Sequence, residues 1–325
     1  MSPKLSIIVP VYNHEKYVKQ CINGILKQKV DFEYEVLIGE DCSTDSSATI
    51  LREMQKDLPE YFHIFYREKN MGMGQKGNAS DLGNRALGEY IITVEGDDYW
   101  IYDKKLQEQV DFLDSHSEYV AVAHNCQVVD EDSNIIDVKY PECKENEYTF
   151  KHYLKWLLPG QLATVMYRKS YYPISEKFYN EFKLYDTFAG DRLKAFLMLT
   201  EGKFFCIQKK WSAYRFVTSH GSSFSANYKR DKKLFENEEL FYKSIKNYSK
   251  YIQNEEAERV SAKLRYSFIL EHCFGKEKAF NISYYFQELS SENKKTYLVI
   301  YSLKKLLMKI LYDIKYVLKK LVKAV

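Results

Sequence analysis

Three carboxylates crowd together directly after a short strand-like segment. Glu95, Asp97 and Asp98 follow residues 90–93 within the stretch VEGDDYW. Like charges at this spacing repel, and loss of water near the end of a strand adds to the cost. A divalent cation such as Mg²⁺ or Mn²⁺ relieves that repulsion, because these ions take carboxylate oxygens and commonly keep phosphate and water ligands. The alternative is a solvated acidic loop, but the aromatic residues Tyr99 and Trp100 that follow favour an enclosed pocket.

Polar groups also follow two earlier strand-like segments, residues 5–11 and 34–39. The first runs into Pro10, Val11, Tyr12 and Asn13, and the second is followed by Glu40 and Asp41. Asp41 can cap the next helix, or it can accept a hydrogen bond from the ring N–H of a base or from a ribose hydroxyl. The carboxyl ends of parallel strands meet at one edge of a sheet, where ligands bind. The three strand ends therefore predict a single site.

A glycine-rich stretch matches a dinucleotide fingerprint but lacks its context. Gly72, Gly74 and Gly77 fit G-x-G-x-x-G, yet that pattern belongs at the first turn between strand and helix. Here that turn, residues 11–15, contains no glycine, which argues against a nicotinamide-dependent enzyme. Glycines beside Lys76 better suit a loop shaped around phosphates or a sugar.

Apolar runs and amphipathic segments alternate along the first two thirds of the chain. The expected strands are residues 5–11, 34–39, 63–66, 90–94, 119–124, 163–167 and 203–207, and the expected helices are 14–29, 46–56, 79–87 and 191–200. This alternation predicts an α/β fold with a mostly parallel, Rossmann-like central sheet flanked by helices. From about residue 227 the sequence becomes polar and helical in period. We therefore expect one domain over residues 1–226 and a helical C-terminal region over 227–325.

The composition is that of a soluble globular protein. Of the 325 residues, 45% are hydrophobic and 29% charged, which is ordinary for this class. The net charge of +3 is too small to argue for nucleic-acid binding. The six cysteines show no metal-ligand or redox spacing, and we find no signal peptide and no run of about 18 apolar residues. A cytoplasmic protein with reduced thiols is expected.

The last twenty or so residues form a basic amphipathic pattern. Between residues 304 and 323, seven lysines and one aspartate fall on one half of a helical wheel, and the leucines, isoleucines and valines fall on the other. Such a helix can pack on its own domain or in the interface of a homo-oligomer. A basic face opposite a broad apolar face also suits an anionic membrane surface. We favour the membrane, and expect a peripheral protein on the inner face of the cell membrane.

Four motifs together resemble the family 2 glycosyltransferases, which have the GT-A fold. They are SIIVPVYN at residues 6–13, EDCSTDS at 40–46, NMG at 70–72 and GEYIITVEGDD at 88–98. The motifs occur in the order and at the spacing of that family, so that jointly they are specific. The resemblance is dense over residues 4–112 and thinner to about residue 225.

The resemblance implies a nucleotide-sugar site at the predicted strand ends. The implied donor-binding residues are Pro10, Val11, Tyr12 and Asn13 around the nucleotide, Asp41 at the base, Lys76, Arg215 and His220 near the diphosphate, and Glu95 and Asp97. Residues 95–97 match the D-x-D metal motif with Glu in place of the first Asp. Asp97 and Asp98 are therefore the expected ligands of Mn²⁺ or Mg²⁺, and Glu95 acts behind them or on the sugar.

The family also needs a base that deprotonates the acceptor hydroxyl. Asp191 stands at the corresponding place, with Asp186 as the second choice, although an Asp that opens a helix is by itself more typical of a cap. The implied reaction is an inverting, metal-dependent transfer of a sugar, most simply from a UDP-sugar, to a saccharide or lipid-linked saccharide in cell-surface polysaccharide or capsule synthesis. A sugar nucleotidyltransferase and a catalytically silent nucleotide-sugar-binding protein are the alternatives.

Overall fold

The chain forms two compact units, Met1–Asn237 and Glu238–Val325. The computed structural model describes residues 2–72, 77–171, 181–182, 190–217, 234–274 and 279–323. Strands and helices alternate in the described part of the first unit, whereas the described part of the second is helical.

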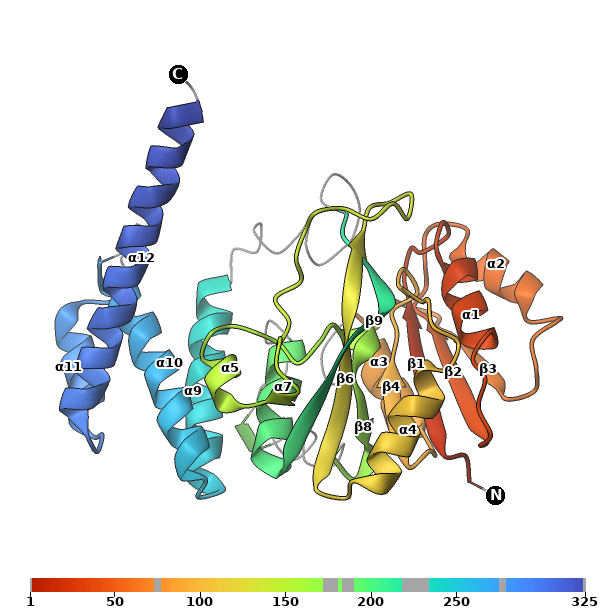
Figure 1. Cartoon of the computed structure of the whole chain (residues 1–325), viewed down its shortest axis with the longest axis horizontal. Coiled ribbons are helices and arrows are strands. Elements are labelled where there is room, and N and C mark those ends of the chain that lie inside the picture. The colour runs from red at the N-terminus through yellow and green to blue at the C-terminus, as the bar shows by residue number, and fades with distance from the viewer. Residues whose placement is uncertain are drawn as a thin grey trace. The chain divides into compact units, whose positions relative to one another are not determined.

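A single β-sheet forms the centre of the first unit (Figure 1). Among the described residues its strands are β1 Leu5–Val11, β2 Tyr34–Glu40, β3 Phe62–Tyr66, β4 Tyr90–Thr93, β5 Tyr99–Trp100, β6 Tyr119–Val129, β7 Glu147–Tyr148, β8 Met166–Arg168 and β9 Lys203–Arg215. They lie in the order β3-β2-β1-β4-β8-β6-β9-β5, and β7 pairs with β9. The block β3-β2-β1-β4 is parallel, whereas β8 runs antiparallel to β4 and β6. The predicted α/β fold is confirmed.

Helices pack against this sheet. They are α1 Val18–Leu26, α2 Ser47–Met54, α3 Asn78–Arg85, α4 Lys105–Ser115, α5 Phe150–Tyr153 and α7 Gly190–Glu201, with 3₁₀ turns at Leu162–Thr164 and Lys169–Tyr171. The near-continuous burial of β1 is typical of a parallel strand covered on both faces. Its alternate residues Leu5, Ile7, Val9 and Val11 join one core cluster with apolar residues of α1, α2 and α4. This packing holds the carboxyl end of β1 beside those of β2 and β4.

Several parts of the sheet differ from the expected segments. The expected strand 163–167 is a 3₁₀ turn at Leu162–Thr164 followed by β8 at Met166–Arg168, and β7 was not predicted. β6 and β9 extend well beyond the predicted 119–124 and 203–207. Polar residues such as Asn125 and Gln127 interrupt the apolar pattern. The two strands nevertheless stay paired in parallel as far as Val129 and Arg215, across the register shifts at His124/Asn125 and Asn125/Cys126. The short strand β5 and the helix α4 were not predicted. β5 has two residues, too few to give a periodic signal.

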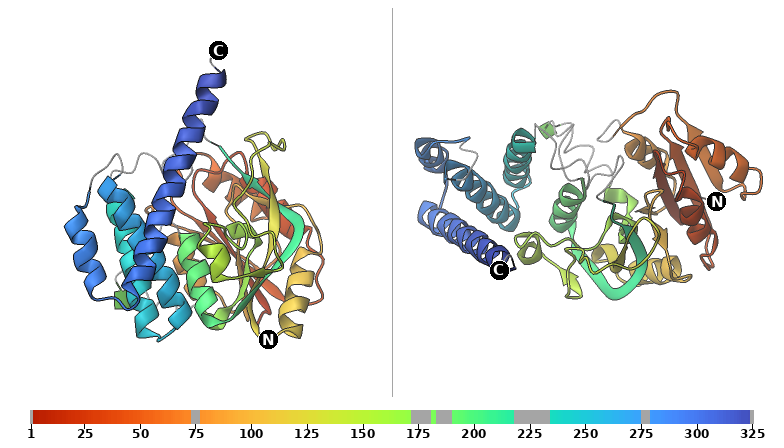
Figure 2. Two further views of the ribbon diagram at one scale, coloured as in Figure 1. Left: turned by 60° about the vertical axis from the view of Figure 1, so that its left-hand side comes forward. Right: turned by 90° about the horizontal axis from the view of Figure 1, so that it is seen from above.

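The second unit consists of helices in its described part. They are α9 Leu234–Tyr251, which begins just before the unit boundary, α10 Glu255–Phe274, α11 Ile282–Ser290 and α12 Lys295–Lys323. α12 is one continuous helix in both views of Figure 2, and it packs on α10. Lys246 and Glu292 form a buried ion pair, and the Tyr266 hydroxyl donates to Glu292 at 3.1 Å. Among the described helices, none has the length and apolar character needed to cross a bilayer.

Candidate active site

The loop that follows β4 gathers three carboxylates, and we call its residues 94–98 the acidic loop. Side-chain oxygens of Glu95, Asp97 and Asp98 all lie within 4.8 Å of one another. The loop is fixed to β1, because the Gly96 N–H donates to the carbonyl of Pro10 at 3.1 Å. A Cβ atom at position 96 would lie 2.7 Å from the His14 ring, so only glycine allows this close approach. Carboxylate oxygens at this spacing fit a hard divalent cation.

Asp98 and Asp97 have different surroundings. Asp98 is 1% exposed, and its two oxygens accept from the backbone N–H of Arg215 at 2.8 Å and from the Gln161 amide at 2.6 Å. Burial, together with the charges of Asp97 and Glu95, raises its pKa well above the usual range. The Asp97 side chain is partly exposed and lies 3.9 Å from the His14 ring nitrogen Nε2. Asp97 is therefore the more accessible of the two predicted metal ligands.

Glu95 interacts electrostatically with a second acidic residue, Asp191. Glu95 is exposed, but surrounding protein atoms limit the hydration of its carboxyl group and, with the charges of Asp97 and Asp191, raise its pKa to about 8. Lys194 opposes this shift. Asp191 lies in the first turn of α7, so the helix brings a residue distant in sequence to the acidic loop.

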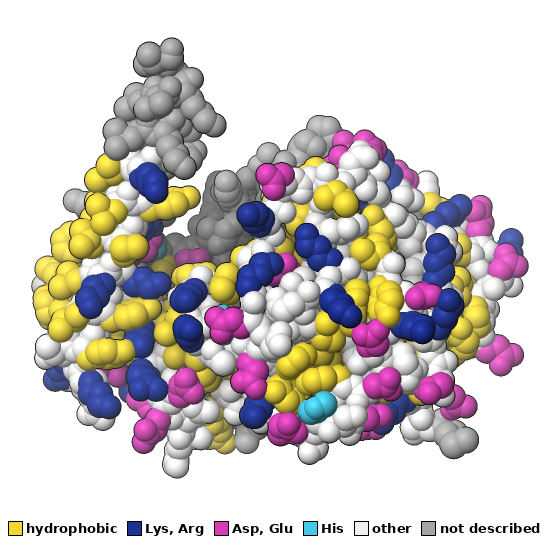
Figure 3. Space-filling view, in the orientation of Figure 1, with side chains coloured by type: hydrophobic (Ala, Val, Ile, Leu, Met, Phe, Trp, Pro, Cys, Tyr) yellow, Lys and Arg dark blue, Asp and Glu magenta, His cyan; other side chains and the backbone are white. Residues whose placement is uncertain are grey.

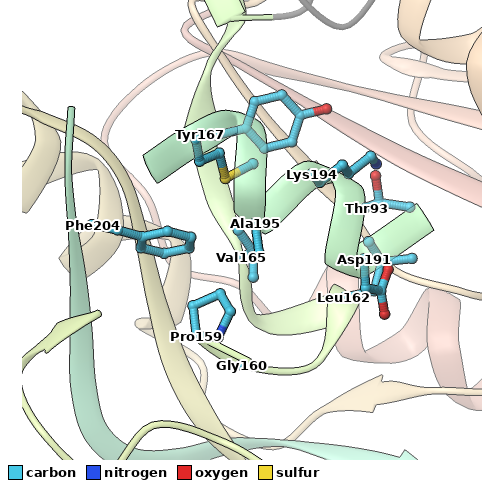
Figure 4. Close-up of a pocket in the computed structure, with 11 residues that line it drawn as sticks. Thr93, Pro159, Gly160, Leu162, Val165, Tyr167, Asp191, Lys194, Ala195 and Phe204 are labelled. Atoms are coloured by element: carbon cyan, nitrogen blue, oxygen red, sulfur yellow. The ribbon is translucent and has the colours of Figure 1, made fainter. Parts of the chain in front are cut away.

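Asp191 and Lys194 border a cavity between α7 and the sheet (Figure 4). The cavity has an empty volume of about 370 Å³, counting the open space at its mouth, and is lined by Thr93, Pro159, Gly160, Leu162, Val165, Tyr167, Asp191, Lys194, Ala195, Met198 and Phe204. Burial raises the pKa of Asp191, and the Lys194 charge opposes that rise. A carboxylate with a raised pKa beside an open space is suited to take a proton from a bound hydroxyl.

The turn after β1 is locked to the loop after β2. Asn13 has a left-handed φ of 58°, and its side-chain oxygen accepts from the Thr44 N–H at 2.9 Å. Ser43 in turn accepts from the Asn13 N–H at 3.0 Å. Pro10 and Tyr12 are partly exposed at this edge. Val11 is 1% exposed and belongs to the core, so its side chain does not line the crevice as predicted.

Asp41 holds the segment that follows β3. Its carboxylate oxygens accept from the backbone N–H groups of Met71 at 2.7 Å and Gly72 at 3.2 Å, and the side chain of Asn70 donates to its carbonyl. Asp41 is 4% exposed. A carboxylate can accept further hydrogen bonds, so contact with a base stays a prediction. Lys76, Asp186 and His220 lie outside the described residues.

Comparison with known proteins identifies the family. The sequence profile of "Glycosyl transferase family 2" matches residues 6–172, just over half of the chain. The chain belongs to this family. The match includes the strand ends of β1 and β2 and the acidic loop, and ends before Asp191.

Curated relatives match between about a third and two fifths of this chain. An uncharacterized protein of Mycobacterium tuberculosis is 37% identical over 128 residues, which are 39% of this chain and 36% of that protein. The putative teichuronic acid biosynthesis glycosyltransferase TuaG of Bacillus subtilis is 34% identical over 34% of this chain and 42% of its own length. Poly(ribitol-phosphate) beta-N-acetylglucosaminyltransferase TarS of Staphylococcus aureus is 36% identical over 35% of this chain and 19% of its own length. The matches thus span less than half of each relative.

Solved structures in the comparison extend over most of the chain. The crystal structure of TarS 1–349 with UDP-GlcNAc has a TM-score of 0.60 and 22% identity, covering 92% of this chain and 79% of that one. The mannosyltransferase PcManGT of Pyrobaculum calidifontis, in complex with GDP-Man and Mn²⁺, has a TM-score of 0.50 and 15% identity, covering 96% of this chain and 88% of that one. At these identities the likeness establishes a shared fold.

Arg215 lies beyond the segment matched by the family profile and contacts the acidic loop. It ends β9 and is 4% exposed, and each of its guanidinium nitrogens donates to a protein acceptor. Its guanidinium group is thus occupied within the protein beside the acidic loop, and its contact with a diphosphate stays a prediction. Its partners come from distant parts of the chain, which a sequence motif does not reveal.

His14 was missed as a site residue. It directly follows Asn13, and the left-handed turn at Asn13 leads the chain toward the acidic loop, where the His14 ring lies against Gly96 and Asp97. The sequence offered one signal for this role: His14 directly follows the motif at residues 6–13. A histidine here places a ring nitrogen beside the carboxylate proposed to bind a cation.

Proposed function

We propose that the chain is an inverting, metal-dependent glycosyltransferase that uses a nucleoside diphosphate sugar, most simply a UDP-sugar, as donor. The observation that carries this proposal is the acidic loop of a family 2 domain, in which three carboxyl groups lie within 4.8 Å of one another. Asp191 is near enough for its charge to raise the pKa of Glu95, which supports it as the candidate base. Family membership and the UDP complexes of TarS support the choice of donor.

We assign the cation, Mn²⁺ or Mg²⁺, to Asp97 with Glu95 beside it. Asp98 was predicted as a ligand. It is 1% exposed, and its side chain holds the Arg215 N–H and the Gln161 amide, so we give it the role of holding the loop, and its direct contact with the cation stays a prediction. The donor set of hard carboxylate oxygens fits either ion. When bound, the ion neutralises the charge that develops on the leaving diphosphate.

Asp191 is proposed as the general base. It would take the proton of the acceptor hydroxyl while the oxygen attacks the anomeric carbon opposite the leaving group, so that the configuration inverts. Pro10, Tyr12 and Asn13 would border the nucleotide, and Asp41 would contact the base. Hydrogen bonds from the backbone N–H groups of Met71 and Gly72 hold the Asp41 carboxylate at the end of β2, which supports this role.

Two substitutions separate the roles of cation ligand and base. We expect Asp97→Asn and Asp191→Asn each to lower transfer from a UDP-sugar by about 10²–10⁴-fold, while only Asp97→Asn weakens Mn²⁺-dependent UDP binding. Donor hydrolysis across UDP- and GDP-sugars and UDP calorimetry measure both effects. Asp111→Asn, an exposed position on α4, is the matched control.

Two results would contradict the assignment. Full transfer activity in Asp191→Asn would place the base elsewhere. Mn²⁺-dependent UDP binding without turnover of any donor, by a wild-type chain given candidate acceptors, would favour the catalytically silent nucleotide-sugar-binding protein.

We further propose that the acceptor is a saccharide or lipid-linked saccharide of a surface polysaccharide, and that α12 docks on the anionic inner face of the cell membrane. The names of TuaG and TarS support the acceptor class. Apolar side chains are exposed along α12, among them Leu303, Leu307, Ile310, Leu311 and Ile314 (Figure 3). Exposed Lys304 and Lys315 flank them. Apolar contact combined with positive charge fits an anionic lipid surface.

A further inference from the structure

We infer that Arg215 is the residue that fixes the acidic loop in its cation-binding shape. The inference rests on the proposed function, because it concerns how that cation site is built. Arg215 contacts two successive residues of the acidic loop: its backbone N–H donates to the Asp98 carboxylate at 2.8 Å, and its Nε donates to the Asp97 carbonyl at 2.9 Å. One residue thus sets both the main chain at position 97 and the side chain at position 98.

The other side of the guanidinium group is anchored to two further segments. Nη1 donates to the carbonyls of Asp130 at 2.8 Å and Glu131 at 3.0 Å, and Nη2 donates to the Gln20 side chain at 2.8 Å. Both Nη atoms lie 3.2 Å from the Ser133 hydroxyl. Arg215 therefore ties the acidic loop to α1 and to the turn after β6.

Only arginine can make this set of contacts. Its planar group offers five N–H donors in a fixed fork, whereas a lysine ammonium offers three donors around a point charge. The group is also 4.1 Å from the centre of the Tyr17 ring, a packing contact that favours a planar cation. A lysine at position 215 would keep the positive charge and the backbone N–H but lose the fork.

The fork matters because the acidic loop assembles like charges in advance. The three carboxyl groups lie within 4.8 Å of one another, and those that are ionised repel one another and act to spread the loop when no cation is bound. With the Asp97 carbonyl and the Asp98 carboxylate both held by Arg215, the Asp97 side chain stays in place. Arg215 is in this sense a positioning residue, which acts on the cation through Asp97.

A second arginine offers a matched control at the opposite end of β4. Arg168 donates from Nε to the Tyr119 carbonyl at 2.9 Å and from Nη2 to the Leu113 carbonyl at 2.6 Å. Its register partner on β4 is Tyr90, the first residue of that strand. Arg168 thus has the same chemistry as Arg215, a fork that holds backbone carbonyls, but it does not touch the acidic loop.

The test compares Arg215→Lys, Arg168→Lys and Asp97→Asn in the full chain. Mn²⁺ affinity is measured by calorimetry with Mn²⁺ alone and with UDP, and thermal unfolding is recorded for each variant. We expect Arg215→Lys to weaken Mn²⁺ binding about 10- to 100-fold, the range for residues that orient metal ligands. Arg168→Lys should lower the melting temperature and leave Mn²⁺ affinity unchanged. Faster amide hydrogen exchange at residues 94–98 in Arg215→Lys provides a readout that needs no cation.

The outcomes distinguish this inference from the proposed function. Wild-type Mn²⁺ affinity in Arg215→Lys, or an equal loss of affinity in Arg168→Lys, would overturn the role of Arg215, even when Asp97→Asn abolishes binding. A folded wild-type chain that binds no Mn²⁺ with UDP present would instead overturn the cation site itself. If Arg215→Lys does not fold, Gln20→Ala, which removes one acceptor of Nη2, must weaken Mn²⁺ binding in the same direction.

Discussion

Asp81 connects two guanidinium groups to the end of β2. Its carboxylate accepts from Arg67 at 2.6 Å and from Arg85 at 2.7 Å. Arg67 also donates to the Asn78 side chain, which donates to the carbonyl of Gly39 at 2.7 Å. This network of hydrogen bonds links α3 to β2, the strand that directly precedes Asp41.

These contacts predict a pH-dependent contribution to stability. The hydrogen bonds from Arg85 and Arg67 hold the pKa of Asp81 below its usual value, so its stabilising effect is present above the unfolded pKa of about 3.9 and is lost as the pH falls through the folded pKa. We expect Asp81→Asn to lower the free energy of unfolding by about 1 kcal/mol at pH 7, since solvent screens part of the interaction. The difference from wild type should shrink as the pH falls below about 3.9 and through the folded pKa. Urea denaturation across this range measures it, and a difference that does not depend on pH would contradict it.

Part of the site was predictable at this scale because its signals are local. Glu95, Asp97 and Asp98 lie within four positions directly after an apolar strand, and strand ends are where α/β proteins bind ligands. The roles within the set were not predictable. Asp98 differs from Asp97 only through its contacts with Gln161 and Arg215, which are far away in sequence.

At the scale of elements, β1, β2 and β4 were predicted closely because each is a short apolar run that the sheet buries. β5 was missed since its two residues pair only with β9, a strand more than a hundred residues later. The extra length of β6 and β9 has the same origin: pairing between them overrides local polarity. Long-range pairing, which a local pattern does not contain, thus decides the second half of the sheet.

Close packing before β4 makes one glycine irreplaceable. A Cβ atom at Gly88 would lie 2.5 Å from the Ser6 nitrogen and 2.6 Å from the Leu5 carbonyl carbon, both in the backbone of β1. We expect Gly88→Ala to lower the free energy of unfolding by about 1–3 kcal/mol, the usual cost of overpacking. Urea denaturation provides the measurement.

Gly190 serves as the control for this substitution. It begins α7, and among the described residues, apart from its chain neighbours and its own helix backbone, no atom lies within 4 Å of an added Cβ. Gly190→Ala should be neutral or stabilising by about 0.5–1 kcal/mol, because alanine favours helix. Equal destabilisation by both changes would show that loss of glycine, rather than contact with β1, is responsible.

At the scale of the whole molecule, α12 presents apolar and basic side chains together. From residue 303 to residue 315 nearly all side chains are exposed, so the helix offers far more apolar surface than its packing on α10 uses. The amphipathic pattern was visible in the sequence, because a wheel of one helix needs no tertiary information. Which residues pack on α10 was not visible, since it depends on the second helix.

We expect the full chain to sediment with vesicles that contain phosphatidylglycerol at low salt and to dissociate as salt rises. Lysines near the surface contribute about 1 kcal/mol each, and salt shortens the screening length from about 10 Å at 0.1 M to about 3 Å at 1 M. Replacing Leu307 and Leu311 with serine should abolish binding at every salt concentration.

Ile135→Ser, at a strongly exposed apolar position in the first unit, is the control and should bind as wild type. Failure of the wild-type chain to sediment at low salt would overturn membrane docking. If the serine variant instead dissociates a homo-oligomer, as measured by analytical ultracentrifugation, α12 is an interface between copies.

The contacts that Arg215 makes with the acidic loop have a consequence for how the protein folds during synthesis. Asp98 and Arg215 are 117 positions apart, and Gln20 and Arg215 are 195 apart. On the ribosome, the acidic loop emerges long before β9 exists to hold it, and closing such long loops is entropically slow. Until β9 is made, Arg215 is not available to restrain the carboxylates. We therefore expect the acidic loop to reach the shape proposed for cation binding only after β9 has paired.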